Sequence, residues 1–335
     1  MILILNCGSQ SVKWKIFNEK SELIKENKLD FFDMSDFERV LTNELLKIKE
    51  NIVLVGHRIV HGGEKFQKPM EITDDNLEEL EKVSHLAPLH NPYNILGIKI
   101  CKNIFKKAKH IAVFDTEFFV DLPERVSTYA LPESILKEFK IKRYGFQGIS
   151  HEYVAKKAAE KLGKPIEELK IITCHLGGGA SISAIKNGKA IDTSMGFTPL
   201  EGLVMMTRAG NIDAGIILQM IEKLTLEETK KILNTESGIK GICGESDMQK
   251  LLKRIEAGNK KAELAFDIFV YSIKKYIGAY YAILGGCDVL VFTGSIGSGN
   301  QKTREAICKD LNILSETKIL SIETDEELAI AQKLK

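Results

Sequence analysis

Two segments of the chain place glycine and serine turns between apolar strands, a pattern that suits phosphate binding. Residues 1–17 read MILILNCGSQSVKWKIF, and residues 171–188 read IITCHLGGGASISAIKNG. Such turns expose backbone N–H groups and hydroxyls, which are the donors that a phosphate oxygen needs. A single hairpin of this kind is common and usually binds nothing. Two at matching places in the two halves indicate a duplicated α/β domain with phosphate held in the cleft between the copies.

An arginine in each half of the chain could supply positive charge to an anionic ligand. Arg58 lies in HRIVHGGE, and Arg208 lies in MTRAGNID. A guanidinium group can bind a carboxylate or a phosphate through two parallel hydrogen bonds. Two arginines that converge would neutralise a phosphoryl group during its transfer. A surface salt bridge remains an alternative for Arg58, and spacing alone does not show that the two arginines meet.

Polar residues at strand ends are further candidates. Asn6 ends the first strand, and Ser9, Ser11 and Lys13 follow it. The Asn carbonyl oxygen and the donor-rich turn together suit magnesium-bound phosphate, although an ordinary capped hairpin is the alternative. Asp115 ends a short apolar strand, where a carboxylate either points into a cleft or caps the next turn.

Histidines and a second glycine-rich turn complete the set. His90 and His175 stand beside proline or glycine turns, whereas His57, His85 and His110 are interpreted as structural. The turn GSIGSGN follows VLVF and could receive a nucleotide, although a strand followed by a glycine-rich turn is a weak signal on its own.

Length and composition limit the classes of protein that fit. A chain of 335 residues forms two domains or one large one. The net charge of +1 argues against a nucleic-acid partner, and the apolar runs are too short to span a membrane. The six cysteines are scattered without CxxC pairs, and no signal peptide is apparent, so we expect reduced thiols in a cytoplasmic protein.

These residues need strands and helices that position them. We expect hairpins at 1–17 and 171–188, and further strands at 51–55, 111–114 and 288–293. We expect helices at 36–50, 74–83, 94–108, 150–162, 213–222, 226–233, 262–284 and 325–333, with Ser35, Ser150 and Thr324 as N-caps. On residues 262–284 the predicted apolar face contains Leu264, Ile268, Tyr271, Ile277, Tyr281 and Leu284. A hinge is expected near residues 145–150.

Taken together, the motifs resemble those of the acetokinase family almost from end to end. The matching segments are LNCGSQSVK, GHRIVHGGE, APLHNP, VFDTEF, RYGFQGISHEYV, CHLGGGAS, DTSMGFTPLEGLVMMTRAGNID, VFTGSIGSGN and TDEELAIA. The resemblance implies an α/β protein with duplicated actin-like, sugar-kinase (ribonuclease H-like) domains flanking a central cleft. It places residues 1–147 with the C-terminal helix 322–335 in one domain, and residues 148–321 with the nucleotide-binding elements in the other. A homodimer is also implied.

The resemblance further implies Mg²⁺-dependent (or Mn²⁺-dependent) phosphoryl transfer between ATP and a short carboxylic acid, giving an acyl phosphate and ADP. Asn6 and Glu326 would hold the metal. The implied catalytic residues are Arg58, His90, Asp115, Gln147 and Arg208. The acid would contact Arg58 and an apolar pocket made of Val60, Leu89, Phe146 and Pro199. The residues implied to bind nucleotide or phosphate are Ser9, Ser11, Lys13, His175, Gly177, Gly178, Gly179, Asp247, Met248, Gln249, Ser295, Ile296, Gly297, Ser298 and Gly299.

The chemistry agrees with this set of residues. A carboxylate acceptor is already ionised at neutral pH, so the reaction needs no general base. It needs charge neutralisation, because one anion attacks another. Two arginines and a divalent cation would supply it, and domain closure would align the reacting groups.

Four departures from the family pattern keep alternatives open. Gln147 stands where the family has histidine, Gly178 where it has asparagine, and Gln249 where arginine is usual, and GSIGSGN replaces Gly-Ile-Gly-Glu-Asn. Three of the four lie on the nucleotide side, and the chain is shorter than usual for the family. The alternatives are a different phosphoryl donor such as pyrophosphate, propionate as the acid, or a non-catalytic sensor of acyl phosphate or nucleotide.

Overall fold

The computed structural model describes residues 1–8, 11–88 and 90–335, which form two compact units. The first unit comprises Met1–Val120, Phe146–Ser150 and Asp325–Lys335, and the second comprises Asp121–Gly145 and His151–Thr324. The C-terminal segment therefore returns to the N-terminal unit. The domain boundaries expected at residues 147 and 322 stay a prediction, and the compact units group residues 121–145 with the second half.

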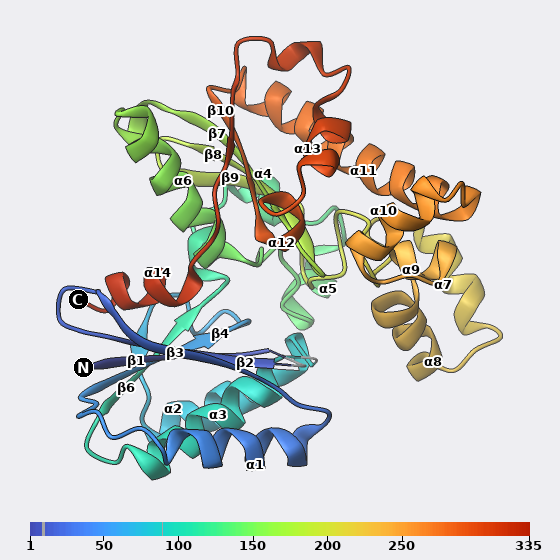
Figure 1. Ribbon diagram of the computed structural model, residues 1–335. Helices are drawn as coiled ribbons and strands as arrows, with labels where there is room; N and C mark the ends of the chain where they lie inside the picture. The colour runs from blue at the N-terminus through green and yellow to red at the C-terminus, as the bar shows by residue number, and fades with distance from the viewer. Residues whose placement is uncertain (9–10, 89) are drawn as a thin grey trace. The chain divides into compact units, whose positions relative to one another are not determined.

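The first unit is built on a six-stranded sheet with the order β3-β2-β1-β4-β6-β5 (Figure 1). The strands are β1 (Ile2–Cys7), β2 (Ser11–Phe17), β3 (Leu23–Asp30), β4 (Leu54–Ile59), β5 (Met70–Glu71) and β6 (Lys109–Phe114). Strands β1, β2 and β3 pair antiparallel, whereas β1, β4 and β6 run parallel. The carboxyl ends of β1, β4 and β6 therefore meet at one edge of the sheet.

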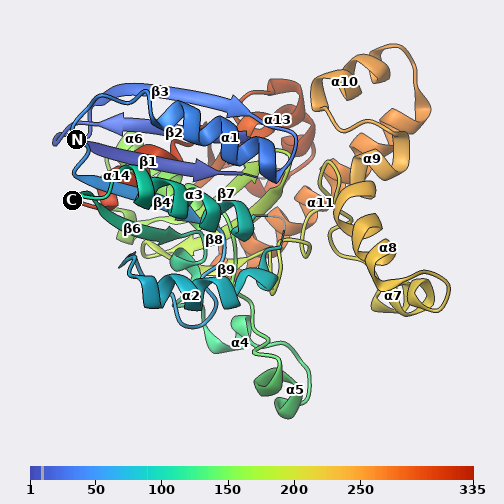
Figure 2. The ribbon, with the colours of Figure 1, turned by 90° about the horizontal axis from the view of Figure 1, so that it is seen from below.

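Helices cover both faces of this sheet, which explains the nearly continuous apolar runs of β1 and β6. Leu3 and Leu5 of β1 pack in a cluster with residues of α1 (Met34–Leu45) and α3 (Asn91–Ile104). Ile2 and Ile4 pack instead with Ile330 of α14 (Glu326–Lys333). Figures 1 and 2 show α14 on the opposite side of the sheet from α1, α2 (Asp74–Lys82) and α3.

The second unit repeats this topology in a five-stranded sheet with the order β11-β10-β7-β8-β9. Its strands are β7 (Lys170–Leu176), β8 (Ala180–Lys186), β9 (Lys189–Thr193), β10 (Val289–Thr293) and β11 (Lys318–Ser321). An antiparallel trio, β7 to β9, is again followed by two parallel strands. The predicted duplication and both glycine-turn hairpins are thus confirmed.

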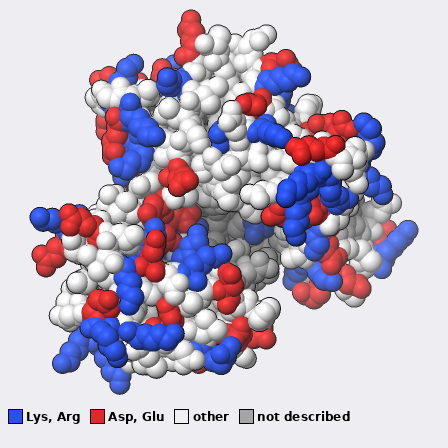
Figure 3. Space-filling view, in the orientation of Figure 1, with Lys and Arg blue, Asp and Glu red and all other residues white. Residues whose placement is uncertain are grey.

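The remaining helices lie mostly in the second unit. They are α4 (Glu124–Ser127), α5 (Glu133–Glu138), α6 (Gly148–Leu162), α7 (Ala214–Ile221), α8 (Leu226–Lys231), α9 (Gly238–Cys243), α10 (Met248–Glu256), α11 (Lys260–Leu284), α12 (Gly294–Gly297) and α13 (Gln301–Cys308). Within the described residues, no helix has the length and apolar character needed to cross a bilayer. Acidic and basic side chains are intermingled on the face drawn in Figure 3. All six cysteines are unpaired.

Three predicted helix caps are wrong. Asp33 rather than Ser35 caps α1, and Asp325 rather than Thr324 caps α14. In both helices an aspartate lies one or two positions from the predicted hydroxyl, and its charged oxygen interacts more favourably with the exposed N–H groups and the positive end of the helix dipole. Helix α6 begins at Gly148, so Ser150 lies inside the first turn.

Two element boundaries also differ from expectation, and both changes matter for the site. Strand β4 covers residues 54–59 rather than 51–55, so Arg58 lies on the strand itself. Helix α3 begins at Asn91 rather than at residue 94. Pro92 is accommodated in its first turn, where the missing N–H would have had no helical partner.

The predicted apolar face of α11 is partly wrong. Leu264, Ile268 and Tyr271 are 54%, 36% and 66% exposed. The buried residues of the helix are Ala262, Ala265, Phe269, Val270, Ile273, Ile277, Tyr280 and Leu284. The buried stripe therefore shares Ile277 and Leu284 with the prediction but follows a different face over the first half of the helix.

Strands β4 and β6 carry a buried pair of histidines. Nε2 of His57 lies 3.0 Å from Nδ1 of His110, whose Nε2 lies 3.2 Å from the Phe105 carbonyl oxygen. Burial lowers the pKa of both side chains, and their mutual proximity lowers that of His57 further. Their interpretation as structural residues is consistent with this position.

We expect the free energy of unfolding to fall as the pH falls below about 6.5. The unfolded chain protonates His57 and His110 near their ordinary pKa, whereas the folded chain resists protonation, so acid favours the unfolded state. Urea unfolding at about pH 7.5 and pH 5 should show a smaller acid loss in His57→Gln than in the wild type. The exposed His85→Gln serves as the control. Equal acid losses in His57→Gln and wild type would contradict this account.

Candidate functional site

The central feature of the first unit is a fork between Arg58 and Asp115. Nε and Nη2 of Arg58 donate to the two carboxylate oxygens of Asp115 at 3.0 and 2.7 Å. Arg58 lies next to Ile59, which packs on the α2–α3 face of the sheet, and Asp115 follows Phe114 on that same face. Strand alternation therefore turns Arg58 and Asp115 toward the α14 face.

The same alternation brings Asn6 to this face, because Ile2 and Ile4 of β1 also point toward α14. Nη1 of Arg58 donates to Asn6 Oδ1 at 3.1 Å and to Glu326 Oε2 at 2.8 Å. Asn6 Nδ2 donates to Glu326 Oε2 at 3.1 Å and to Glu327 Oε1 at 2.6 Å. The structure thus brings together four predicted residues from β1, β4, the end of β6 and α14.

Acidic groups outnumber basic ones around this cluster. Lys15 donates to Asp325 at 2.8 Å and lies 3.8 Å from Glu327. Together with Asp115 and Glu326, four carboxyl groups therefore face three cationic side chains: Arg58, Lys15 and Lys13, whose charge acts on Glu327. Such an excess favours the binding of a further cation.

The electrostatics of the cluster show how strongly its charges are coupled. Burial raises the pKa of Asp115, and Arg58 opposes that shift. Burial and then the neighbouring Glu326 raise the pKa of Glu327. Burial disfavours the charge on Arg58, but Asp115 and Glu326 together outweigh it and raise its pKa. Arg58 is thus a fully compensated cation.

The oxygen atoms of Asn6 and Glu326 fit the chemistry of a hard divalent cation. Asn6 Oδ1 and Glu326 Oε2 both accept from Nη1 of Arg58, so the guanidinium lies where the two oxygens converge. Among the described residues, no three His, Cys, Asp or Glu side chains group as metal ligands. Magnesium does not need such a cage, because it commonly uses one or two protein oxygens together with water and phosphate oxygens.

Two asparagines that the sequence reasoning missed fix the neighbouring backbone. Asn94 Oδ1 accepts from the Val60 N–H at 3.1 Å, and its Nδ2 donates to the Cys7 carbonyl at 2.6 Å. Asn91 forms a similar pair of hydrogen bonds with the His61 backbone. Both are buried on α3, and the polar letters in the apolar helix start HNPYN were the available signal.

The predicted apolar residues Val60 and Phe146 are both buried in the first unit. The ring of His61, next to Val60, lies 5.3 Å from the ring of Phe146. Leu89 lies outside the described residues, as does Ser9, and His90 occupies the N-cap position of α3.

Gln147 directly precedes a residue that contacts the backbone of Asp115. The next residue, Gly148, donates its N–H to the Asp115 carbonyl at 2.9 Å, and a Cβ at Gly148 would lie 2.3 Å from that oxygen. Gln147 itself has a positive φ of 59°, which is uncommon for a residue with a side chain. The backbone at this position is therefore held by its surroundings rather than by its own preference.

In the second unit, the glycine turn after β7 lies beside α12. A Cβ at Gly177 would be 3.5 Å from Ser295 Oγ and 3.9 Å from His175 Nε2. A Cβ at Gly294 would lie 2.6 Å from the Leu176 carbonyl oxygen, and its φ is +79°. Glycine at position 294 therefore lets α12 begin directly against the end of β7. Three of the predicted phosphate-binding residues are thus neighbours.

The segment GSIGSGN is a short helix followed by a cap, rather than the open turn that was predicted. Ser298 Oγ donates to the Gly294 carbonyl at 2.8 Å within α12. Nη1 of Arg304 donates to the carbonyls of Gly297 and Ser298 at 2.9 and 2.7 Å. Arg304, which sequence reasoning missed, thus stabilises the C-terminal end of α12.

The other predicted nucleotide-binding residues occupy ordinary positions. Asp247 caps α10 by accepting from the Lys250 N–H at 2.9 Å, Met248 is buried, and Gln249 is exposed. Lys13 and Ser11 lie on β2, where Lys13 is paired with Asn6 across the antiparallel ladder.

Arg208 contrasts with Arg58. Its Nη1 donates to the Pro199 carbonyl at 3.4 Å and lies 3.8 Å from Met205 Sδ. No carboxylate in the described part of the chain lies within ion-pair distance of Arg208, and burial lowers its pKa. The guanidinium is therefore a largely buried cation without an acidic partner.

Helix α9 holds the backbone around Arg208. The N–H groups of Ser237 and Ile239 donate to the carbonyls of Thr207 and Met205 at 3.1 and 3.0 Å. Gly238, between them, has a φ of +63°, and a Cβ there would lie 2.6 Å from the Arg208 carbonyl oxygen. This close backbone contact fixes the loop from which the guanidinium projects.

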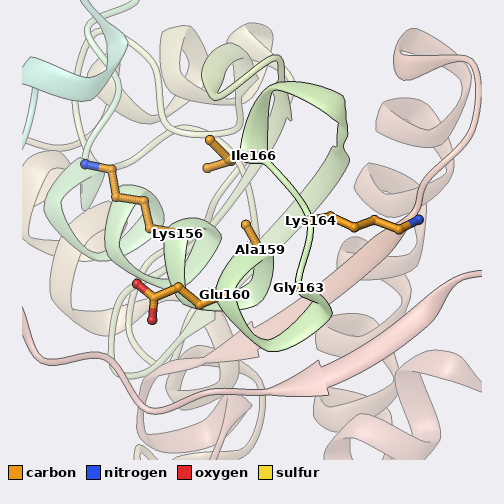
Figure 4. A pocket seen from close by; sticks show the side chains of 6 residues that line it. All are labelled: Lys156, Ala159, Glu160, Gly163, Lys164 and Ile166. Atoms are coloured by element: carbon orange, nitrogen blue, oxygen red, sulfur yellow. The ribbon is translucent and has the colours of Figure 1, made fainter.

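One surface pocket of about 340 Å³ lies at the end of α6. Its lining residues are Lys156, Ala159, Glu160, Gly163, Lys164 and Ile166 (Figure 4). None is a predicted site residue, and Lys156 already pairs with Glu152 at 2.7 Å.

Comparisons with known proteins agree with the geometry. The model of the acetokinase family matches residues 24–333. The chain is 43% identical to acetate kinase from Dictyoglomus turgidum, covering 99% of this chain and 96% of the relative. It is 40% identical to acetate kinase 2 from Clostridium perfringens, covering 99% and 98%. The first alignment extends over 389 positions against 335 residues here, so the relative contains segments that this chain lacks.

Solved structures give the same result. Porphyromonas gingivalis acetate kinase matches with a TM-score of 0.89 and 36% identity over 100% of this chain and 99% of that one. A propionate kinase from Francisella tularensis matches with a TM-score of 0.90 and 36% identity over 99% and 98%. A ROK family protein from Streptococcus pneumoniae, 13% identical with a TM-score of 0.50, shares the fold alone. The predicted actin-like, sugar-kinase fold class is confirmed, and the chain belongs to the acetokinase family.

Proposed function

We propose that this protein transfers a phosphoryl group between ATP and acetate, producing acetyl phosphate and ADP. Its family membership and the names of its relatives as acetate kinases support this reaction. They do not favour pyrophosphate as the donor or a sensor without catalysis. A propionate kinase among the similar structures keeps a longer acid as the second candidate substrate.

The observation that carries the proposal is the unpaired charge of Arg208. Arg58 already has Asp115 and Glu326 as counter-ions, whereas the polar contacts of the Arg208 guanidinium with described residues are to a carbonyl oxygen and a thioether. A buried cation without a partner costs free energy, which binding of an anion recovers. In the transfer reaction, the anion would be the moving phosphoryl group, whose negative charge a guanidinium neutralises.

We assign Asn6 and Glu326 as the residues that would hold Mg²⁺, or Mn²⁺, because their oxygen atoms converge within an acidic cluster. When bound, the metal neutralises phosphate oxygens. Arg58, held by Asp115, would bind the carboxylate of the acid. His90 and Gln147 would complete the catalytic set, with His175, the turn Gly177–Gly179, and α12 on the phosphate and nucleotide side.

The acid pocket would contain Val60, Phe146 and Pro199, with Leu89. Val60 and Phe146 belong to the first unit and Pro199 to the second. Arg58 and Arg208 would both act on the reacting group.

We also propose a cytoplasmic homodimer. Helix α7 has no buried residue, and Ile216, Leu218 and Ile221 are 48%, 62% and 46% exposed. Such an apolar helix is typical of a surface that a second subunit covers. The six unpaired cysteines suit a reducing compartment.

The purified full-length chain should form acetyl phosphate, trapped as its hydroxamate, from acetate and ATP in the presence of Mg²⁺. Removal of the metal with EDTA should abolish product formation, and added Mg²⁺ or Mn²⁺ should restore it. In the reverse direction, a panel of ADP, other nucleoside diphosphates and inorganic phosphate identifies the phosphoryl acceptor, and ADP should be the best. Absence of product with any acid of one to four carbons would contradict the proposed function.

A further inference from the structure

A hydrogen-bond network that no predicted site residue explains surrounds the loop between β9 and Arg208. The hydroxyl of Tyr129 donates to Glu201 Oε2 and accepts from the Phe197 N–H at 2.8 Å. Nη2 of Arg143 donates to Glu201 Oε1 at 2.7 Å. Both oxygens of one carboxylate are thus occupied by residues that lie 72 and 58 positions earlier in the sequence.

Arg143 also connects the Glu201 carboxylate with the backbone of two further segments. Its Nη1 donates to the Thr193 carbonyl at 3.2 Å, and its Nε donates to the Val126 carbonyl at 3.3 Å. The guanidinium carbon lies 5.3 Å from the centre of the Tyr129 ring. The planar guanidinium of Arg143 thus donates hydrogen bonds from all three of its nitrogens, which the ammonium group of a lysine could not reproduce.

The network sits directly on the backbone of the loop. A Cβ at Gly196 would lie 1.6 Å from Glu201 Oε2 and 1.9 Å from the Tyr129 hydroxyl, so any side chain there would displace the network. The Gly196 carbonyl accepts from the N–H groups of Tyr144 and Gly145 at 3.1 and 3.4 Å. The loop therefore cannot shift without breaking several hydrogen bonds.

Pro199 lies between the two positions that the network holds, Phe197 and Glu201. On the far side, the Gly202 N–H donates to Asn211 Oδ1 at 2.8 Å, and the Gly202 carbonyl accepts from the Asn211 N–H at 3.0 Å. The Pro199 carbonyl also accepts from Arg208. The ring of Pro199 is thus placed by contacts on both sides of it in the sequence.

We propose that Tyr129, Arg143 and Glu201 are positioning residues that set the length of acid the enzyme accepts, because they fix Pro199. This inference rests on the proposed function, in which Pro199 borders the acid. A fixed wall excludes an extra methylene, and a pocket of this type discriminates between acids that differ by one methylene by about 10- to 200-fold. If the network were broken, Pro199 could move, and the enzyme would discriminate less between acids that differ by one methylene. The groups that bind nucleotide would be unchanged.

The test compares kcat/KM for acetate, propionate and butyrate in wild type, Tyr129→Phe and Glu201→Gln. Tyr129→Phe keeps the ring but loses the hydroxyl that joins Phe197 to Glu201, and it should change the acetate-to-propionate ratio by about tenfold. Glu201→Gln keeps the shape but weakens the pairing with Arg143, so its change should be smaller. The KM for ATP should stay within about twofold in both variants. Tyr271→Phe, which removes an exposed hydroxyl outside the network, is the matched control.

The outcomes separate the inference from the function on which it rests. A wild type without activity on any acid contradicts the proposed function. An active wild type whose variants keep the acetate-to-propionate ratio, whether or not their total activity falls, overturns the positioning role alone. If Tyr129→Phe does not fold, Glu201→Gln gives the same ratio measurement.

Discussion

Replacement of Arg208 by alanine is expected to lower kcat by at least about 100-fold while leaving the protein as stable as the wild type or more stable. The guanidinium is largely buried, and among residues 1–8, 11–88 and 90–335 its polar contacts are the Pro199 carbonyl at 3.4 Å and Met205 Sδ at 3.8 Å. Its removal breaks no ion pair in the described part of the chain. It would, however, remove charge neutralisation that the reaction needs when negative charge gathers at the phosphoryl group.

The measurement pairs initial rates of hydroxamate formation with thermal unfolding of the same samples. Arg208→Lys should recover only part of the lost rate, because an ammonium group keeps the charge but loses the planar fork. Arg39→Ala, which removes an arginine with a 69% exposed side chain, should leave kcat unchanged. A kcat for Arg208→Ala within about threefold of wild type would remove the main support for the proposed role.

The convergence of Asn6, Arg58, Asp115 and Glu326 could be anticipated in part from the sequence. Strand ends carry the first three residues, and parallel strands present their carboxyl ends along one edge. The observed order β1-β4-β6 makes those ends neighbours. Residue alternation then selects the face, and α14 returns to that face with Glu326 in its first turn. The sequence motifs identified these residues, and the sheet topology explains why their side chains lie close together.

The charge state of the two arginines could not be predicted in the same way. Both lie in specific motifs, and both were expected to bind anions. Whether an arginine is already neutralised depends on which distant segments reach it, and Glu326 reaches Arg58 across 268 positions of sequence. No local sequence pattern indicates an ion pair between residues so far apart. For the same reason, Glu327, Lys15 and the Tyr129–Arg143–Glu201 network were missed.

Errors in the elements have local physical causes. Nearby aspartates, Asp33 and Asp325, are the caps in place of Ser35 and Thr324, because a carboxylate interacts more strongly with free N–H groups at a helix start. The segment GSIGSGN became a helix because the backbone of β7 lies against Gly294 and Arg304 covers the end of the turn. Glycine content alone predicted a turn, whereas tertiary contacts decided the conformation.

Replacement of Asp115 by asparagine should differ from Arg208→Ala, because it should lower stability as well as activity. The side chain of Asp115 is 2% exposed and pairs with Arg58 through two hydrogen bonds. Removal of one member of a buried ion pair commonly costs about 3–5 kcal/mol, because the other charge is left without its partner. Glu326 still pairs with Arg58 at 2.8 Å, so we expect about 3 kcal/mol, the lower end of that range.

The loss of activity should follow from the same contacts. With Asp115 neutral, Nε and Nη2 of Arg58 lose their charged partner, and the guanidinium is free to turn toward Glu326 and away from the acid. Correct orientation of a binding group is worth about 100-fold or more in rate, so kcat/KM for acetate should fall by that order. Urea unfolding and initial rates are the two measurements. Asp121→Asn breaks an exposed pair with Lys189, whose side chains are 70% and 72% exposed, and should change the free energy of unfolding by less than about 1 kcal/mol. If Asp115→Asn behaved like Asp121→Asn in both measurements, the fork between Arg58 and Asp115 would have no part in holding the fold or the acid.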